Sequence, residues 1–260
     1  MLIDSHCHLN YATLGEDVPG VLARARSAGV GGFLAISCRM SEWDGVIAIA
    51  DAHAGVWASV GIHPHEADEH PDTDADTLIA ATAHPRVIGI GETGLDYYYD
   101  KSDRGRQQAS FRSHIMAARA TGLPLIVHTR DAEADTLALL KEAGEGTLTG
   151  VIHCFTASQA FAEEALALGF YISLSGIVTF RNARDLQATA RTIPANRLLV
   201  ETDAPYLAPV PMRGKTCEPA FVAHTARFLA DLRGEPLETL AATTTANFHA
   251  LFTKAAGAGA

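Results

Sequence analysis

Cysteine is scarce in this sequence, and its cysteines lie far apart. The 260 residues contain four cysteines with no CxxC pair among them, Cys7, Cys38, Cys154 and Cys217. This spacing argues against a zinc ribbon or a disulfide framework. It is typical of a protein from a reducing compartment.

Long apolar runs are also missing. No run approaches the ~20 residues that a membrane-spanning helix needs. Residues 1–6 reach polar side chains at once and lack the basic and apolar regions of a secretory signal. We therefore expect a soluble, cytoplasmic protein that contacts no membrane, and the sequence points to no obligate protein partner.

Positive charge is the third shortage. Twenty Lys and Arg residues face thirty Asp and Glu residues, so the formal net charge is −10. A protein that binds DNA mainly by releasing counterions needs a basic face, and this chain has few candidates for one. If the substrate is a phosphate ester, bound cations must supply much of the attraction.

Apolar residues, by contrast, make up 48% of the chain and recur in short runs that alternate with amphipathic stretches. The runs are residues 2–3, 32–37, 56–62, 87–90, 123–127, 150–152, 170–174 and 198–200. Eight strand–helix alternations predict a single (β/α)₈ TIM barrel, which typically needs ~250 residues. An open doubly wound sheet is the alternative. We expect one domain over residues 1–254 and a flexible tail at 255–260.

Polar residues follow the predicted strands where a barrel carries its chemistry, at the C-terminal ends. The set comprises His6, His8, Glu92, His128, His153, Glu201 and Asp203. His6 and His8 share one face of an extended segment because side chains alternate along a strand. A lone histidine is more often a core residue than a ligand, but here the coincidence favours a metal site. Imidazole and carboxylate ligands suit zinc, manganese or similar divalent ions.

These residues occur in stretches that resemble the TatD family of metal-dependent hydrolases from Ile3 to about Phe252. The stretches include Asp4-Ser5-His6-Cys7-His8, Gly61-Ile62-His63-Pro64-His65, Gly91-Glu92-Thr93-Gly94-Leu95-Asp96-Tyr97, His128-Thr129-Arg130-Asp131, His153-Cys154-Phe155-Thr156, Glu201-Thr202-Asp203-Ala204-Pro205 and Arg213-Gly214-Lys215. The chain departs from the family's pattern at Cys217, where Asn is frequent, and at Ala157, where Gly is frequent.

The resemblance implies two divalent ions (Mg, Mn or Zn) per chain. One would be held by His6, His8, Glu92 and Asp203. The other would be held by Glu92, His128 and His153, with Glu92 bridging. Glu201 and His63 would orient ligands, touch substrate or help a third ion. The implied activity is that of a deoxyribonuclease, such as a 3′-exonuclease on single-stranded DNA ends.

Two paired ions can activate a water and clamp the oxygens of an in-line displacement. Asp203 is the best candidate for the base that takes the water's proton, and a pure ligand role is its alternative. Arg130, Arg213 and Lys215 are candidate phosphate contacts, although Arg130 could equally be a loop residue paired with a carboxylate.

Two other functions remain open at this point. The same ions could polarise a carbonyl in an amidohydrolase-like enzyme acting on a C–N or C–O bond of a small molecule. Many relatives of that superfamily carry a lysine at the end of strand four, where this chain has Glu92. A metal-binding protein without turnover is the third possibility. It fits poorly with a complete set of ligands and a general base.

Overall fold

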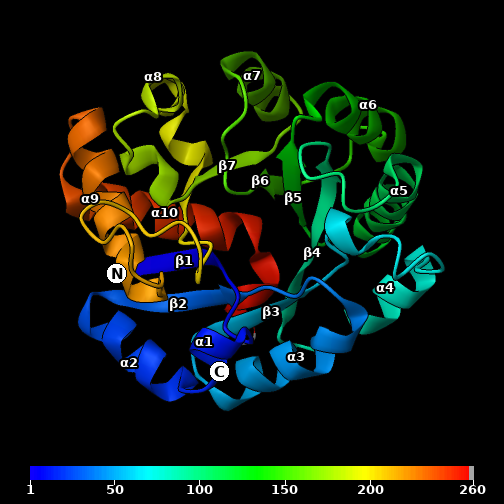
Figure 1. Ribbon diagram of the computed structural model, residues 1–260, viewed down its shortest axis with the longest axis horizontal. Helices are drawn as coiled ribbons and strands as arrows, with labels where there is room; N and C mark the ends of the chain where they lie inside the picture. Colours follow the sequence, from blue (N-terminus) through cyan, green and yellow to red (C-terminus); the bar gives the residue numbers. More distant parts are fainter. Residues whose placement is uncertain (258–260) are drawn as a thin grey trace.

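Eight parallel strands form the centre of the protein, and the computed structural model describes residues 1–257. In chain order the strands are β1 Leu2–Cys7, β2 Val30–Ala35, β3 Val56–Val60, β4 Val87–Asp96, β5 Leu125–Arg130, β6 Gly150–Ile152, β7 Tyr171–Leu174 and β8 Leu198–Val200. Each strand pairs with the next, so the sheet order follows the sequence from β1 to β8. Figure 1 shows the helices arranged around these strands.

Contacts between the first strand and the end of the last one bring the two edges of the sheet together. The backbone N–H of His8 donates to the carbonyl oxygen of Ala204 at 2.8 Å. The Ser5 hydroxyl donates to the carbonyl oxygen of Val200 at 3.0 Å. The sheet is therefore a nearly closed (β/α)₈ barrel, which confirms the predicted fold and excludes the open doubly wound sheet.

Capping residues mark where several of the helices begin. The α-helices are α1 Ala12–Gly15, α2 Val18–Ser27, α3 Trp43–Ala52, α4 Ala75–Ala81, α5 Arg104–Thr121, α6 Glu133–Gly144, α7 Gln159–Ala167, α8 Arg184–Thr192, α9 Val222–Arg233 and α10 Leu237–Leu251. Short 3₁₀ helices are η1 Met40–Glu42, η2 Pro64–Glu66, η3 Gly176–Thr179, η4 Ala195–Arg197, η5 Pro219–Phe221 and η6 Thr253–Ala256. The Asp103 and Ser158 side chains accept N–H bonds at the starts of α5 and α7, as N-cap residues do.

The interior of the barrel is apolar at the end opposite the strand C-termini. One cluster of buried side chains combines Leu34 of β2 and Trp57 of β3 with Phe248 and Leu251 of α10 and with Phe252 just after it. The Trp57 and Phe248 rings lie with their centroids 5.2 Å apart. Helix α10 therefore covers the floor of the barrel, and a second, larger core lies between the strands and the surrounding helices.

Strand alternation carries this apolar interior directly into a polar mouth. In β5 the interior residue Ile126 is followed two positions later by His128, and in β6 Val151 is followed by His153 just after the strand. Residues two apart on a strand point to the same side, so each imidazole continues an interior row. Strand β1 departs from this pattern because its register with β2 is irregular between Asp4 and Cys7.

The end of the chain folds further than expected from its composition. Ala255 lies in the 3₁₀ helix η6 and is buried, whereas the sequence placed it in the tail. Positions 258–260 of that tail lie outside the described residues, so the domain boundary stays a prediction. Within residues 1–257, no helix has both the length and the apolar character to cross a bilayer.

Candidate metal centre

Glu92 lies at the centre of the group of polar side chains at the barrel mouth. Its carboxylate is buried and divides its two oxygens between two sets of imidazoles. Oε2 lies 3.3 Å from His6 Nε2. Oε1 lies 2.7 Å from His153 Nε2 and 3.2 Å from His128 Nδ1. The carboxylate therefore separates and also connects two groups of nitrogen donors.

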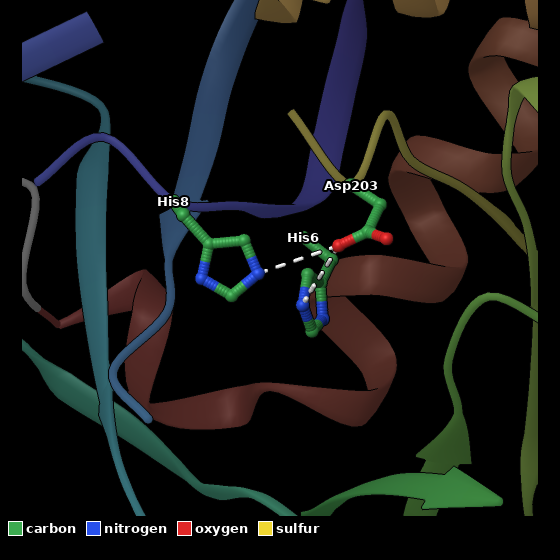
Figure 2. A group of neighbouring side chains, drawn as sticks. All are labelled: His6, His8 and Asp203. Carbon is green, nitrogen blue, oxygen red and sulfur yellow. Dashed lines mark ion pairs between the residues drawn. The ribbon is translucent and has the colours of Figure 1, made fainter. Parts of the chain in front are cut away.

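The first group is completed by the aspartate that follows β8. Asp203 Oδ1 lies 3.3 Å from His8 Nε2 and 3.7 Å from His6 Nε2. Figure 2 shows these two imidazoles and the carboxylate pointing toward one another. Asp203 has a φ of 60°, a left-handed conformation that non-glycine residues adopt rarely and that clusters at functional sites. The backbone is thus held in an unfavourable conformation to aim this carboxylate inward.

The second group is oriented from behind by two further carboxylates. Asp96 Oδ2 lies 3.1 Å from His128 Nε2, so the Nδ1 of the same ring is turned toward Glu92. Glu201 Oε1 lies 3.2 Å from His153 Nδ1 and accepts the backbone N–H of Cys154 at 2.7 Å. Carboxylates that hold the outer nitrogen of a metal-binding histidine fix its tautomer and orientation.

The electrostatics favour ionised carboxylates surrounded by histidines. Burial alone would raise the pKa of Glu92, but the charges of His153, His63 and His6 hold it well below its usual value. Burial is also the largest single effect on Asp203 and would raise its pKa, but the hydrogen bond from His8 and the charges of His6, His8 and His153 together lower it. Both groups are therefore carboxylates at neutral pH, as metal binding requires.

A cation fits this site if atoms that could bind it are not already used in hydrogen bonds. Several potential ligand atoms meet this condition. Within residues 1–257, His6 Nδ1 and Glu201 Oε2 are buried and lack a hydrogen-bond partner, whereas Nε2 of His6 and Nε2 of His153 make ion-pair contacts with Glu92 without hydrogen-bond geometry. Burial lowers the pKa of His6, which keeps its ring in the neutral form that can ligate a metal. Buried polar atoms without partners are costly, and a bound cation would satisfy them.

Four groups of three side chains have candidate ligand atoms within 4.8 Å of one another in the described chain. They are His6, His8 and Asp203; His6, His153 and Glu201; His8, Cys38 and Glu92; and His63, Glu92 and His128. All six ligands expected from the sequence occur in these groups. The residues present therefore fit a site for divalent metal.

The expected substrate contacts are only partly brought together. His63 Nε2 lies 3.4 Å from Glu92 Oε1, and Arg130 lines the cavity above the donors. Arg213 stacks on the Phe180 ring and donates to the carbonyl oxygen of Ala208. Neither Arg213 nor Lys215 is among the described residues that line the cavity.

Three residues at the site were not singled out from the sequence. Asp96 joins His128 to His65, whose Nε2 lies 2.9 Å from the same carboxylate oxygen. Cys38 Sγ lies 3.9 Å from His8 Nδ1 and 3.8 Å from Glu92 Oε2. Asp96 ends the strand that carries Glu92, and Cys38 lies two positions beyond the interior residue Ile36. Strand alternation was the signal that could have identified Cys38.

A parallel barrel whose imidazoles and carboxylates converge beyond the C-terminal ends of its strands defines a metal-dependent hydrolase of the TIM-barrel type. The profile of the family described as TatD related DNase matches residues 3–253. The chain belongs to this family of metal-dependent hydrolases.

Relatives and solved structures agree with this assignment. The chain is 47% identical to the uncharacterized metal-dependent hydrolase YcfH of Escherichia coli K12 over 254 residues, which cover 96% of this chain and 95% of YcfH. It is 35% identical to the 3′-5′ ssDNA/RNA exonuclease TatD of Klebsiella pneumoniae, covering 96% and 97% of the two chains. The crystal structure of YJJV, a TatD homolog from Escherichia coli K12, superposes with a TM-score of 0.91 at 29% identity, covering 97% and 98%.

Proposed function

We propose that this protein is a divalent-metal-dependent deoxyribonuclease that hydrolyses phosphodiester bonds at the 3′ ends of single-stranded DNA. The observation that carries the proposal is the division of the Glu92 carboxylate between two donor groups. Paired sites of this kind suit displacement at phosphorus, where an attacking and a leaving oxygen both need stabilisation. The relative from Klebsiella pneumoniae that is named a 3′-5′ exonuclease supports the choice of substrate.

Two ions would be held by the residues already described. His6, His8, Glu92 and Asp203 would hold one, and Glu92, His128 and His153 would hold the other. When bound, the ions supply Lewis acidity, which lowers the pKa of water and neutralises phosphate charge. With a net charge of −10, the chain depends on such cations to attract a polyanion.

The chain's own residues would position the reactants and move the proton. Asp203 is ionised at neutral pH because hydrogen bonding to His8 lowers its pKa, so it can accept a proton from the attacking water. Glu201 holds the ring of His153 through Nδ1 and thereby keeps Nε2 aimed at Glu92. His63 and Arg130, at the edge of the cavity, would contact the phosphate.

Metal-dependent hydrolysis of labelled DNA tests this function. Protein stripped with EDTA is reloaded with Mg²⁺ or Mn²⁺ and incubated with single strands labelled at the 5′ end. We expect stepwise shortening from the 3′ end that requires the added metal. Asp203→Asn should lower the rate by about 100-fold or more, as removal of a general base commonly does.

A matched carboxylate variant serves as the control. Asp231→Asn changes an exposed carboxylate in the last turn of α9, far from the donors in the sequence, and should cut DNA at the unchanged rate. Turnover of lactones or amides with no release of nucleotides under any divalent metal would instead support the amidohydrolase-like alternative. That result would overturn the nuclease proposal.

A further inference from the structure

Three tyrosines are unusually exposed, and all of them lie at the mouth of the barrel. Tyr98, Tyr99 and Tyr206 have 57%, 52% and 53% of their surface accessible. Tyr99 and Tyr206 line the cavity above the donors, and Tyr98 lines a hollow beside it. Large aromatic side chains left open beside a polar cavity are typical of binding surfaces.

The segment that carries two of these tyrosines is held in place by a buried residue. The backbone N–H groups of Tyr98 and Tyr99 donate to Asp96 Oδ1 at 3.0 and 2.8 Å. Asp96 is fully buried and is tied to His65 and His128 through its other oxygen. The tyrosine rings are therefore displayed from a fixed backbone that is linked directly to the donor group.

Two cations accompany these rings and have no carboxylate partner. The Arg130 guanidinium carbon lies 4.1 Å from the Tyr98 ring centre and 4.8 Å from that of Tyr99. Lys101 Nζ lies 5.7 Å from the Tyr99 ring centre. Within residues 1–257, no carboxylate oxygen lies within ion-pair distance of Arg130 or Lys101. Arg39, which also lines the cavity, is instead paired with Glu66 at 2.7 Å.

The hollow surface continues from the donors across Arg130. A cavity of about 480 Å³ is lined by Glu92, Asp203, Tyr99 and Arg130. A second hollow of about 350 Å³ is lined by Tyr98 and shares Arg130 with the first. A chain molecule that extends from the donors into the second hollow would pass Arg130 and these two tyrosines.

We propose that Tyr98, Tyr99, Lys101 and Arg130 form a subsite, which we call the aromatic platform, for a nucleobase of single-stranded DNA and its adjoining phosphate. This proposal rests on the proposed function. Open aromatic rings stack any base, and unpaired cations attract the backbone phosphates. A duplex hides the faces of its bases within the stack, so the platform favours single strands.

Binding of strands that lack one base tests the platform. The probes are fluorescent 12-nucleotide DNA strands, intact or with one abasic residue at successive positions from the 3′ end, and Ca²⁺ replaces the activating metal. We expect fluorescence anisotropy to show a Kd about 5- to 100-fold higher when the abasic residue occupies one or two particular positions. The double variant Tyr98→Ala/Tyr99→Ala should bind the intact strand this weakly and lose the dependence on position.

Arg104 offers a matched control. Its guanidinium carbon lies 4.3 Å from the Tyr97 ring centre, but its charge is paired with Asp100 and neither Arg104 nor Tyr97 is among the described residues lining the cavity. Arg104→Ala should therefore retain the affinity and the dependence on position, whereas Arg130→Ala should weaken the binding of every strand. The same Kd at every abasic position in the wild-type protein would overturn the proposal, as would persistence of the position effect in the double variant.

The outcomes separate this proposal from the proposed function. Wild-type protein is also incubated with Mn²⁺ and a strand in which every residue is abasic, whose phosphodiesters carry no base. If that strand is cleaved and the Kd is the same at every abasic position, the aromatic platform is contradicted and the nuclease proposal is retained. If the Kd depends on the abasic position but no strand is cleaved, the aromatic platform is supported and the nuclease proposal is contradicted.

Discussion

The carboxylate of Asp96 fixes which nitrogen of His128 faces the centre of the site. Asp96 Oδ2 lies 3.1 Å from His128 Nε2, and His128 Nδ1 lies 3.2 Å from Glu92 Oε1. If the Nε2–H donates to Asp96, a neutral ring presents a lone pair at Nδ1 to another lone pair on Glu92. Two lone pairs repel at this distance, so either a proton or a metal ion must lie between them.

Asp96→Asn should therefore weaken one metal position and spare the other. Without the carboxylate, His128 loses the partner that sets its tautomer. Loss of such a partner typically lowers metal affinity 10- to 100-fold. Titration of the apoprotein with Mn²⁺ or Zn²⁺ should show one weakened and one unchanged site. Asp100 is an exposed carboxylate on the same segment, and Asp100→Asn should leave the metal affinity of both sites unchanged. Equal weakening of both sites would contradict this role of Asp96.

Glu92→Gln should affect both metal positions, because each of its oxygens faces a different donor group. We expect elemental analysis to show loss of metal from both sites and the hydrolysis rate to fall below about 1% of the wild-type value. His128→Ala, in contrast, should retain the ion near His6 and His8. Equal metal loss in the two variants would argue against a bridging carboxylate.

Metal removal should lower thermal stability. Ligands that bind only the folded state stabilise it, by about 2.7 kcal/mol at a concentration 100 times Kd. For a chain of this size, such a change shifts the unfolding midpoint by roughly 5–10 °C. Calorimetry of protein dialysed against EDTA and then reloaded with Mn²⁺ should record this increase. His6→Ala should reduce it, and an unchanged midpoint in wild-type protein would count against a metal centre formed by these residues.

His114 predicts a dependence of stability on pH. Its Nε2 accepts the Ile62 N–H at 2.9 Å, and its Nδ1 donates to the carbonyl oxygen of Ser110 at 2.7 Å. Burial lowers its pKa from 6.5 to about 4. Between pH 6.5 and pH 4 the unfolded chain therefore binds a proton at this position and the folded chain does not. The contribution of His114 to the free energy of unfolding is complete above pH 6.5 and is lost as the pH drops toward 4. The loss between pH 7 and pH 5 is about 2 kcal/mol.

A His114→Leu variant isolates this contribution, because leucine neither titrates nor accepts a hydrogen bond. It should be less stable than the wild type at pH 7 by about 1–3 kcal/mol, because the buried Ile62 N–H loses its acceptor. At pH 5 the difference in the free energy of unfolding should be smaller, because the wild type loses stability through His114 and the variant has no group that titrates at this position. Urea unfolding at both values measures the difference. A gap of constant size would show that His114 does not titrate in this range.

The sequence predicted the barrel because its signals are local. Apolar runs define each strand, and alternation carries Val151 and Leu199 of the interior on to His153 and Glu201 of the mouth. The alternation does not reveal side-chain pairs formed across strands. The link from Asp96 of β4 to His128 of β5 depends on register, which the sequence does not contain. The stacking of the Arg213 guanidinium on Phe180 is likewise a contact that the sequence does not reveal, and the role of Arg213 as a phosphate contact stays a prediction.

The position of α10 has a consequence for how material moves through the protein. Phe248 and Phe252 close the barrel beneath the donors, so within the described residues the site is accessible only from the mouth and no channel runs through the barrel. A polymer cannot be threaded from one side to the other. The substrate of this hydrolase and its products must therefore enter and leave through the same opening at the mouth of the barrel.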